Sequence, residues 1–159
     1  MNDEGTVSIA NWRIYTEISN IRKYEVKLNI IQNWGKNIMG YTLIVDDSAT
    51  ERSIISSCLK EFGIEVFEAF SGEEALEKIE QKYPDLILLD IVLPGRSGFE
   101  ICRQLKKSED TNKIPIILCS SKSTDMDKFW GKKQGADAYM PKPIDLEELV
   151  RIVKNFIAA

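Results

Sequence analysis

The stretch D-L-I-L-L-D-I-V-L-P-G-R-S-G-F-E, residues 85–100, decides the fold class of this chain. Its apolar run Leu86–Leu89 ends on Asp90 and is soon followed by the turn dipeptide Pro94-Gly95. An apolar run without polar alternation is typical of a strand buried on both faces of a parallel sheet. Similar apolar runs lie at residues 43–45, 64–69, 116–119 and 138–140.

The segments between these runs have the pattern of helices. Their apolar residues recur at spacings of three and four, as in residues 146, 149, 150 and 153. Gly63 follows the first such segment, and Ser71 with Glu74 has the spacing of a capping box before the second. Alternation of five strands with five helices predicts an α/β fold with a doubly wound, five-stranded parallel sheet.

Composition excludes several functional classes. The chain has 159 residues, a net charge of -4 and a pI near 5.0, which argues against nucleic acid as an electrostatic partner. No apolar run approaches the roughly 18 residues of a membrane span, so we expect no membrane insertion. The scattered cysteines Cys58, Cys102 and Cys119 predict reduced, half-buried thiols in a cytoplasmic protein. The chain contains no histidine, which excludes histidine-based catalysis and phosphohistidine donation.

Residues 1–39 do not follow the alternation, so we divide the chain into an N-terminal extension, 1–39, and a domain, 40–158. The extension contains Trp12 and Trp34 together with mixed helical and strand-like patterns. Met39 stands just before the first strand. One hypothesis is a misassigned translation start or a poorly ordered arm, and the other is an arm that binds a partner.

Polar side chains follow the predicted strands at the point where each strand ends. Asp46 and Asp47 follow the first strand, Asp90 the third, Ser120 the fourth and Lys142 the fifth. Because ligands of open parallel sheets bind outside the carboxyl ends of the strands, we expect these side chains to converge.

This set of groups suits phosphoryl transfer. Three carboxylates that repel one another need a cation, and oxygen-only ligands suit Mg²⁺. Asp90 would be the nucleophile that forms an acyl phosphate. The ammonium group of Lys142 and the hydroxyl of Ser120 would contact the phosphoryl oxygens.

Each of these residues also has an ordinary structural interpretation. Asp47 alone would suit a helix N-cap, and Asp90 a loop before a turn. Ser120 alone would suit a turn, and Lys142 a solvated surface position. The functional interpretation is favoured because four strand ends carry compatible groups at once.

At these residues the chain resembles the receiver domains of bacterial two-component response regulators. The matching stretches are L-I-V-D-D-S at 43–48, the stretch at 85–100, I-P-I-I-L-C-S-S-K at 114–122 and G-A-D-A-Y-M-P-K-P at 135–143. The resemblance covers about residues 41–158 and implies a flavodoxin-like strand order of 2-1-3-4-5.

The resemblance also implies a role for each site residue. Asp90 is then the phosphoacceptor, and Asp46 and Asp47 hold Mg²⁺ together with Asp90 and the backbone carbonyl of Val92. Lys142 binds the phosphate, and Ser120 supplies the switch hydroxyl. Tyr139 falls at the aromatic switch position, and Gly98 matches the glycine after the phosphoacceptor turn.

The region from Cys119 to Tyr139 resembles stand-alone regulators of the PilH and PilG type, from twitching or phototaxis systems. The implied phosphodonor is a chemotaxis-type histidine kinase, and the implied output is protein contact through the fourth helix, fifth strand and fifth helix. We expect a monomer or weak dimer without an output domain, since the chain ends at Ala159. Trp130 serves either this contact face or simple packing.

Two rival functions stay open on the sequence alone. A small Mg²⁺-dependent phosphohydrolase would also use an aspartyl nucleophile, but it would need a second aspartate where Val92 stands. A phosphorylation-independent interaction module with the same fold would lack one of the key charged residues, and all of them are present. We expect a phosphoryl acceptor that self-dephosphorylates slowly and is not a turnover enzyme.

Overall fold

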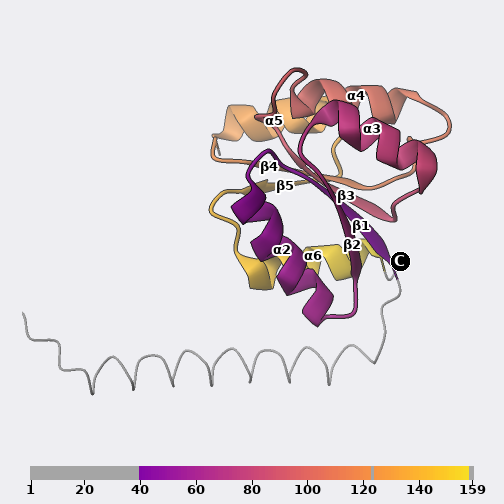
Figure 1. The fold of residues 1–159 in the computed structure, drawn as a ribbon. Coiled ribbons are helices and arrows are strands. Elements are labelled where there is room, and N and C mark those ends of the chain that lie inside the picture. The colour runs from indigo at the N-terminus through magenta and orange to yellow at the C-terminus, as the bar shows by residue number, and fades with distance from the viewer. Residues whose placement is uncertain (1–39, 123, 158–159) are drawn as a thin grey trace, which may run out of the picture. The chain divides into compact units, whose positions relative to one another are not determined.

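The computed structural model describes residues 40–122 and 124–157, and within them five strands alternate with five helices (Figure 1). The extension over residues 1–39 lies outside the described residues, so both hypotheses about it stay untested. The strands are β1 (Tyr41–Val45), β2 (Glu65–Ala69), β3 (Leu86–Asp90), β4 (Ile116–Ser120) and β5 (Ala138–Pro141). The helices are α2 (Ala49–Glu61), α3 (Gly72–Gln81), α4 (Gly98–Lys107), α5 (Asp125–Lys133) and α6 (Leu146–Ile157).

The strands form one parallel sheet in the order β2-β1-β3-β4-β5, which confirms the predicted fold class and strand order. Helices α2 and α6 cover one face of the sheet, and α3, α4 and α5 cover the other (Figure 1). Every residue of β3 and β4 is buried, as continuous apolar runs predict. β2 is only partly buried, because it lies at the sheet edge and pairs with β1 alone.

The helix ends follow local chemistry. Gly63 lies just past α2 with a φ of 78°, a left-handed conformation that glycine adopts readily. The Ser71 hydroxyl accepts from the Glu74 amide at 3.2 Å, as the capping pattern predicts. The Glu74 carboxylate, however, accepts from the Phe70 amide at 2.7 Å, so the second half of the predicted capping box is displaced by one residue.

One expectation about burial needs correction, and for Trp130 the structure bears on the two alternatives that the sequence left open. Cys102 and Cys119 are fully buried, whereas Cys58 is half-buried as expected. Trp130 is not a packed core residue, because 50% of its surface is exposed on α5 beside the similarly exposed Phe129. None of the helices in the described part of the chain is long and apolar enough to cross a membrane.

Candidate phosphoryl-transfer site

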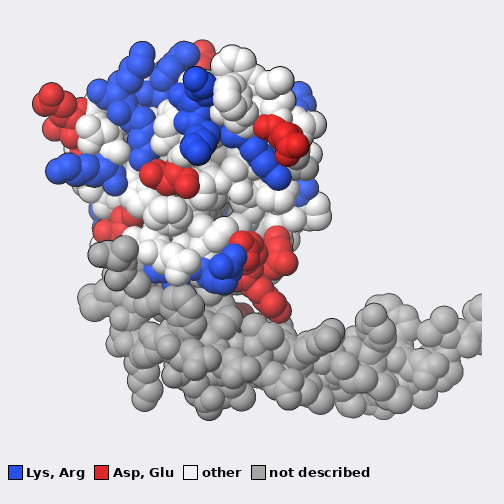
Figure 2. All heavy atoms as spheres, turned by 180° about the vertical axis from the view of Figure 1, so that it is seen from behind, with Lys and Arg blue, Asp and Glu red and all other residues white. Residues whose placement is uncertain are grey.

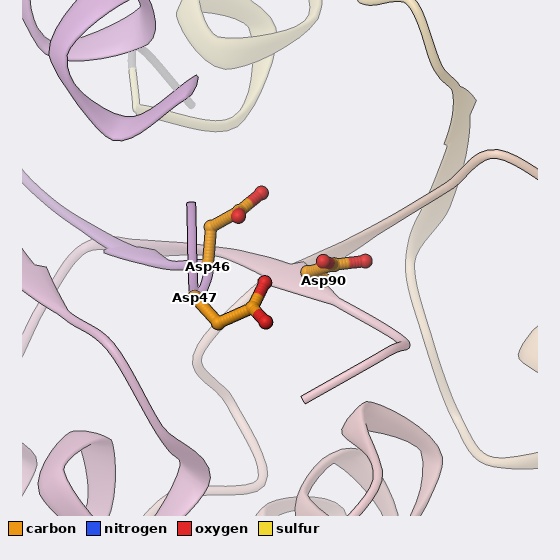
Figure 3. Close-up of side chains that lie close together, drawn as sticks. All are labelled: Asp46, Asp47 and Asp90. Atoms are coloured by element: carbon orange, nitrogen blue, oxygen red, sulfur yellow. The ribbon is translucent and has the colours of Figure 1, made fainter. Parts of the chain in front are cut away.

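Three carboxylates gather at the carboxyl ends of β1 and β3 (Figure 3). Asp46 and Asp47 directly follow β1, and Asp90 is the last residue of β3. Each offers one carboxylate oxygen, and these oxygens lie within 4.8 Å of one another. Asp46 and Asp90 are buried, and Asp47 is exposed. The strand-end rule therefore predicts this cluster correctly.

The turn between β1 and α2 holds the Asp46 carboxylate in place. Asp46 Oδ1 accepts from the Ser48 amide at 2.8 Å. Ser48 is the N-cap of α2, and its hydroxyl accepts from the Glu51 amide at 3.3 Å. The ordinary interpretation of Asp47 as the helix cap is therefore wrong, and its carboxylate stays exposed.

Lys142 brings a positive charge from the end of β5 into the acidic cluster. Its Nζ lies 2.7 Å from Asp46 Oδ2 and 3.2 Å from Asp90 Oδ2. It also lies 2.5 Å from Glu51 Oε2 on α2. The side chain is 13% exposed, so the interpretation as a solvated surface lysine is wrong. The Lys142 amide donates to the Ser120 carbonyl at 2.8 Å, and the peptide bond to Pro143 is cis.

Burial and charge shift the proton equilibria of two of these groups. Burial raises the pKa of Asp90, and repulsion from Asp46 adds to it, while the charge of Lys142 acts in the opposite direction. Burial alone would lower the pKa of Lys142. Its hydrogen bonds to Asp46 and Glu51 outweigh burial and raise that pKa, so Lys142 stays a cation.

Ser120 and Tyr139 both bond to the backbone of Lys122. Ser120 is 1% exposed, and its Oγ accepts from the Lys122 amide at 3.0 Å. The Ser120 side chain also hydrogen-bonds the side chain of Tyr139. Tyr139 is half-buried, and its hydroxyl donates to the Lys122 carbonyl. Val92 is 59% exposed, and its amide donates to Asp90 Oδ1 at 3.2 Å.

Sequence reasoning missed two residues on the first turns of α2. Glu51 contacts Lys142, as described above. Arg52 donates through Nη1 to the Asp46 carbonyl at 2.7 Å and through Nε to Glu68 on β2 at 3.2 Å. Their positions, four and five residues after Asp47, could have indicated the contact, because the first turn of the following helix faces the strand ends.

The donor set can hold a hard cation. Its three carboxylates supply only oxygen, and the positive charge of Lys142 alone does not balance Asp46, Asp47, Asp90 and Glu51. Oxygen-only sites with few protein ligands and an open side suit Mg²⁺. The residues present therefore fit the expected metal.

A five-stranded parallel sheet with this acidic cluster and a strand-end lysine defines a receiver domain. Residues 42–154 match the family described as response regulator receiver domain, and the chain belongs to this family. It is a response regulator of two-component signalling, a signalling module.

Among named relatives, the chain is similar to Protein PilH of Pseudomonas aeruginosa, with 41% identity over 120 residues. This match covers 76% of the chain and 99% of PilH. A putative response regulator from Chloroflexus aurantiacus is 36% identical with a TM-score of 0.72, over 76% of this chain and 98% of that one. The chemotaxis response regulator CheY4 of Vibrio cholerae is 30% identical with a TM-score of 0.70, over 74% and 98% respectively.

Proposed function

We propose that this chain is a single-domain response regulator that accepts a phosphoryl group on Asp90 from a partner histidine kinase. The observation that carries the proposal is the convergence of Lys142 and three carboxylates at the end of β3. Asp46 and Asp90 are both buried and in contact with Lys142, and Asp90 is the one that ends the central strand β3. Similarity to PilH over 99% of its length supports a stand-alone regulator.

In the proposed reaction, an Asp90 carboxylate oxygen attacks the phosphorus of the donor. A new O–P bond forms, and the bond from phosphorus to the leaving group breaks with its electron pair on that group. Lys142 pairs with the phosphoryl oxygens as a point charge. Asp46, Asp47, Asp90 and the Val92 carbonyl would hold Mg²⁺. The ion would neutralise the charges of the carboxylates and of the phosphoryl group.

The Ser120 hydroxyl and Tyr139 form the proposed switch. Donation of the Ser120 hydroxyl to a phosphoryl oxygen would change its present bonds to Tyr139 and to the Lys122 amide. The Tyr139 hydroxyl bonds the carbonyl of the same Lys122, and its ring lies against Gly131 of α5. Movement of the Lys122 backbone would therefore reach both β5 and α5.

The proposed output surface is the face formed by α5, β5 and α6. Phe129 and Trp130 stack edge to face on α5 with ring centroids 6.0 Å apart, and both are half-exposed. Lysine and arginine side chains gather over the region of α4 and α5 (Figure 2). Lys128 directly precedes this aromatic pair, and Lys133 Nζ lies 5.4 Å from the centroid of the Phe129 ring. Similarity to PilH supports a cytoplasmic role in type IV pilus motility.

The direct test is intact-mass analysis after incubation with acetyl phosphate and Mg²⁺. The wild-type protein is expected to gain one phosphoryl group, and Asp90→Asn none. Chelation of Mg²⁺ is expected to suppress the gain. Absence of any gain in the wild type would instead support a phosphorylation-independent interaction module, and turnover of a phosphate ester would support a phosphohydrolase.

A further inference from the structure

Lys142 has a third carboxylate partner that does not belong to the acidic cluster. Glu51 Oε2 lies 2.5 Å from Lys142 Nζ, closer than the oxygens of Asp46 and Asp90. Glu51 belongs to α2, and its amide is bound to the N-cap hydroxyl of Ser48 at 3.3 Å. Both the backbone and the side chain of Glu51 are therefore held at the rim of the site.

The three contacts use the whole donor capacity of the lysine. An ammonium group has three protons, and three carboxylates lie within reach of Lys142 Nζ. A phosphoryl group on Asp90 that bonds Lys142 must therefore replace one of them. Esterification neutralises the Asp90 carboxylate, so its contact with Lys142 can pass to one phosphoryl oxygen. A second phosphoryl oxygen, or a donor oxygen that arrives while Asp90 is still charged, can bond Lys142 only if Asp46 or Glu51 is released.

Burial decides between these two partners. The Asp46 side chain is 4% exposed, so its carboxylate cannot turn to water if it loses the contact with Lys142. The Glu51 side chain is 44% exposed and can return to water when its ion pair breaks. Glu51 is the partner whose release costs less.

We propose that Glu51 is the resting counter-ion of Lys142 and that it competes with the phosphoryl group for this lysine. It acts as a positioning residue that holds back phosphorylation of Asp90, and this role rests on the function proposed above. In the exchange, the Lys142 N–H···O contact to Glu51 breaks and one to a phosphoryl oxygen forms. No covalent bond or proton is transferred between Lys142 and Glu51.

The test compares variants that separate contact from charge. Glu51→Gln removes the charge and weakens the contact. Glu51→Asp keeps the charge but shortens the side chain by about 1.5 Å, which takes it out of hydrogen-bonding distance of Lys142. Glu80→Gln makes the same charge change at an exposed site near the far end of α3. Denaturant unfolding of each variant checks that it is folded.

Two quantities are measured with Mg²⁺ present: the rate of acyl phosphate formation from acetyl phosphate, and the apparent Kd for beryllium fluoride, a non-transferable phosphoryl mimic. We expect both Glu51 variants to be phosphorylated about two- to five-fold faster and to bind the mimic tighter by a similar factor, because partly exposed ion pairs are weak. Glu80→Gln is expected to match the wild type.

Three results would overturn the proposal. In the first, the wild type is phosphorylated as fast as Glu51→Gln or faster. This result would contradict the competition and leave the proposed function intact. Another is a gain in Glu51→Gln without a gain in Glu51→Asp, which assigns the effect to charge and not to the contact. The third is a wild type that takes neither phosphoryl group nor beryllium fluoride, which removes the proposed function together with this inference.

Discussion

At the scale of single residues, two features of Asp90 bear on its proposed role as the phosphoacceptor. Burial raises its pKa and makes its charge unfavourable in the resting site, while Lys142 lies 3.2 Å away as a ready cation. Burial also raises the pKa of Tyr139, so its hydroxyl stays protonated and can donate to Lys122. These features agree with the proposed binding of a cation and transfer of a phosphoryl group at this site.

Val92 governs the expected lifetime of the acyl phosphate. Its side chain is apolar and 59% exposed, so it cannot hold a hydrolytic water by hydrogen bonding. We expect the phosphorylated protein to decay over minutes or longer in Mg²⁺. Val92→Asn adds one amide that can orient water, and we expect decay about five-fold faster, as one hydrogen bond of about 1 kcal/mol would give.

The measurement is the loss of phosphoryl mass over time after removal of acetyl phosphate. Val92→Leu is the matched control, because it changes size without adding a hydrogen-bonding group. A wild-type half-life of seconds would show that some other group activates the water.

At the scale of elements, the sequence patterns predicted all five strands to within two residues at each end, and the burial of each strand follows from its place in the sheet. β3 and β4 were evident because uninterrupted apolar runs suit strands covered on both sides. β2 has the weaker pattern of an edge strand, and its burial follows from topology. The contact of Glu51 with Lys142 was not predictable, because an acidic residue on the first turn of a helix is equally explained by the helix dipole.

Helix α4 begins in direct contact with the end of β3, and Gly98 permits this approach. A Cβ atom on Gly98 would lie 2.1 Å from the Asp90 carbonyl oxygen and 2.8 Å from Ile91 Cα. We expect Gly98→Ala to lower the free energy of unfolding by about 1–3 kcal/mol through overpacking. Because the strain falls on the backbone of Asp90, the rate of phosphorylation should also decrease.

Gly63→Ala is the matched control. A Cβ there meets no atom within 4 Å, but the φ of 78° makes alanine unfavourable by about 1–2 kcal/mol. Gly63 lies where the chain enters β2, away from the carboxyl ends of the strands, so this variant should lose stability and keep its phosphorylation rate. Denaturant unfolding and acetyl phosphate kinetics measure both effects. Equal phosphorylation rates in the two variants would contradict the steric explanation.

At the scale of the whole molecule, the two buried cysteines report on the integrity of the sheet. Burial raises the pKa of Cys102 to about 11 and that of Cys119 to about 12. At pH 8 the first shift alone lowers the thiolate fraction of Cys102 by about a hundred-fold, relative to an ordinary pKa of 9.0. We expect neither cysteine to react with iodoacetamide at pH 8 unless the domain unfolds.

Peptide mass mapping of the labelled protein, with and without urea, measures this protection. Cys58 is half-buried and serves as an internal comparison. Labelling of Cys102 or Cys119 in native protein at the rate seen in urea would contradict the buried core described here.

The sequence predicted those parts of the site that follow from the topology of the sheet alone. Parallel strands bring their carboxyl ends to one edge, so Asp46, Asp47, Asp90 and Lys142 could be placed together from the strand assignment. Side-chain pairing was not predictable, because it depends on the rotation of α2 and on the path of the chain after β5. Those two features determine that Lys142 meets Glu51 and that Arg52 meets the Asp46 carbonyl.

The central claim is that Asp90, among the clustered carboxylates, carries the phosphoryl group. Borohydride reduces an acyl phosphate on aspartate to homoserine, which marks the modified position in the chain. After treatment with acetyl phosphate and Mg²⁺, reduction and peptide sequencing by mass spectrometry should find homoserine at position 90. Homoserine at position 46 or 47, or at none of the three, would contradict the account.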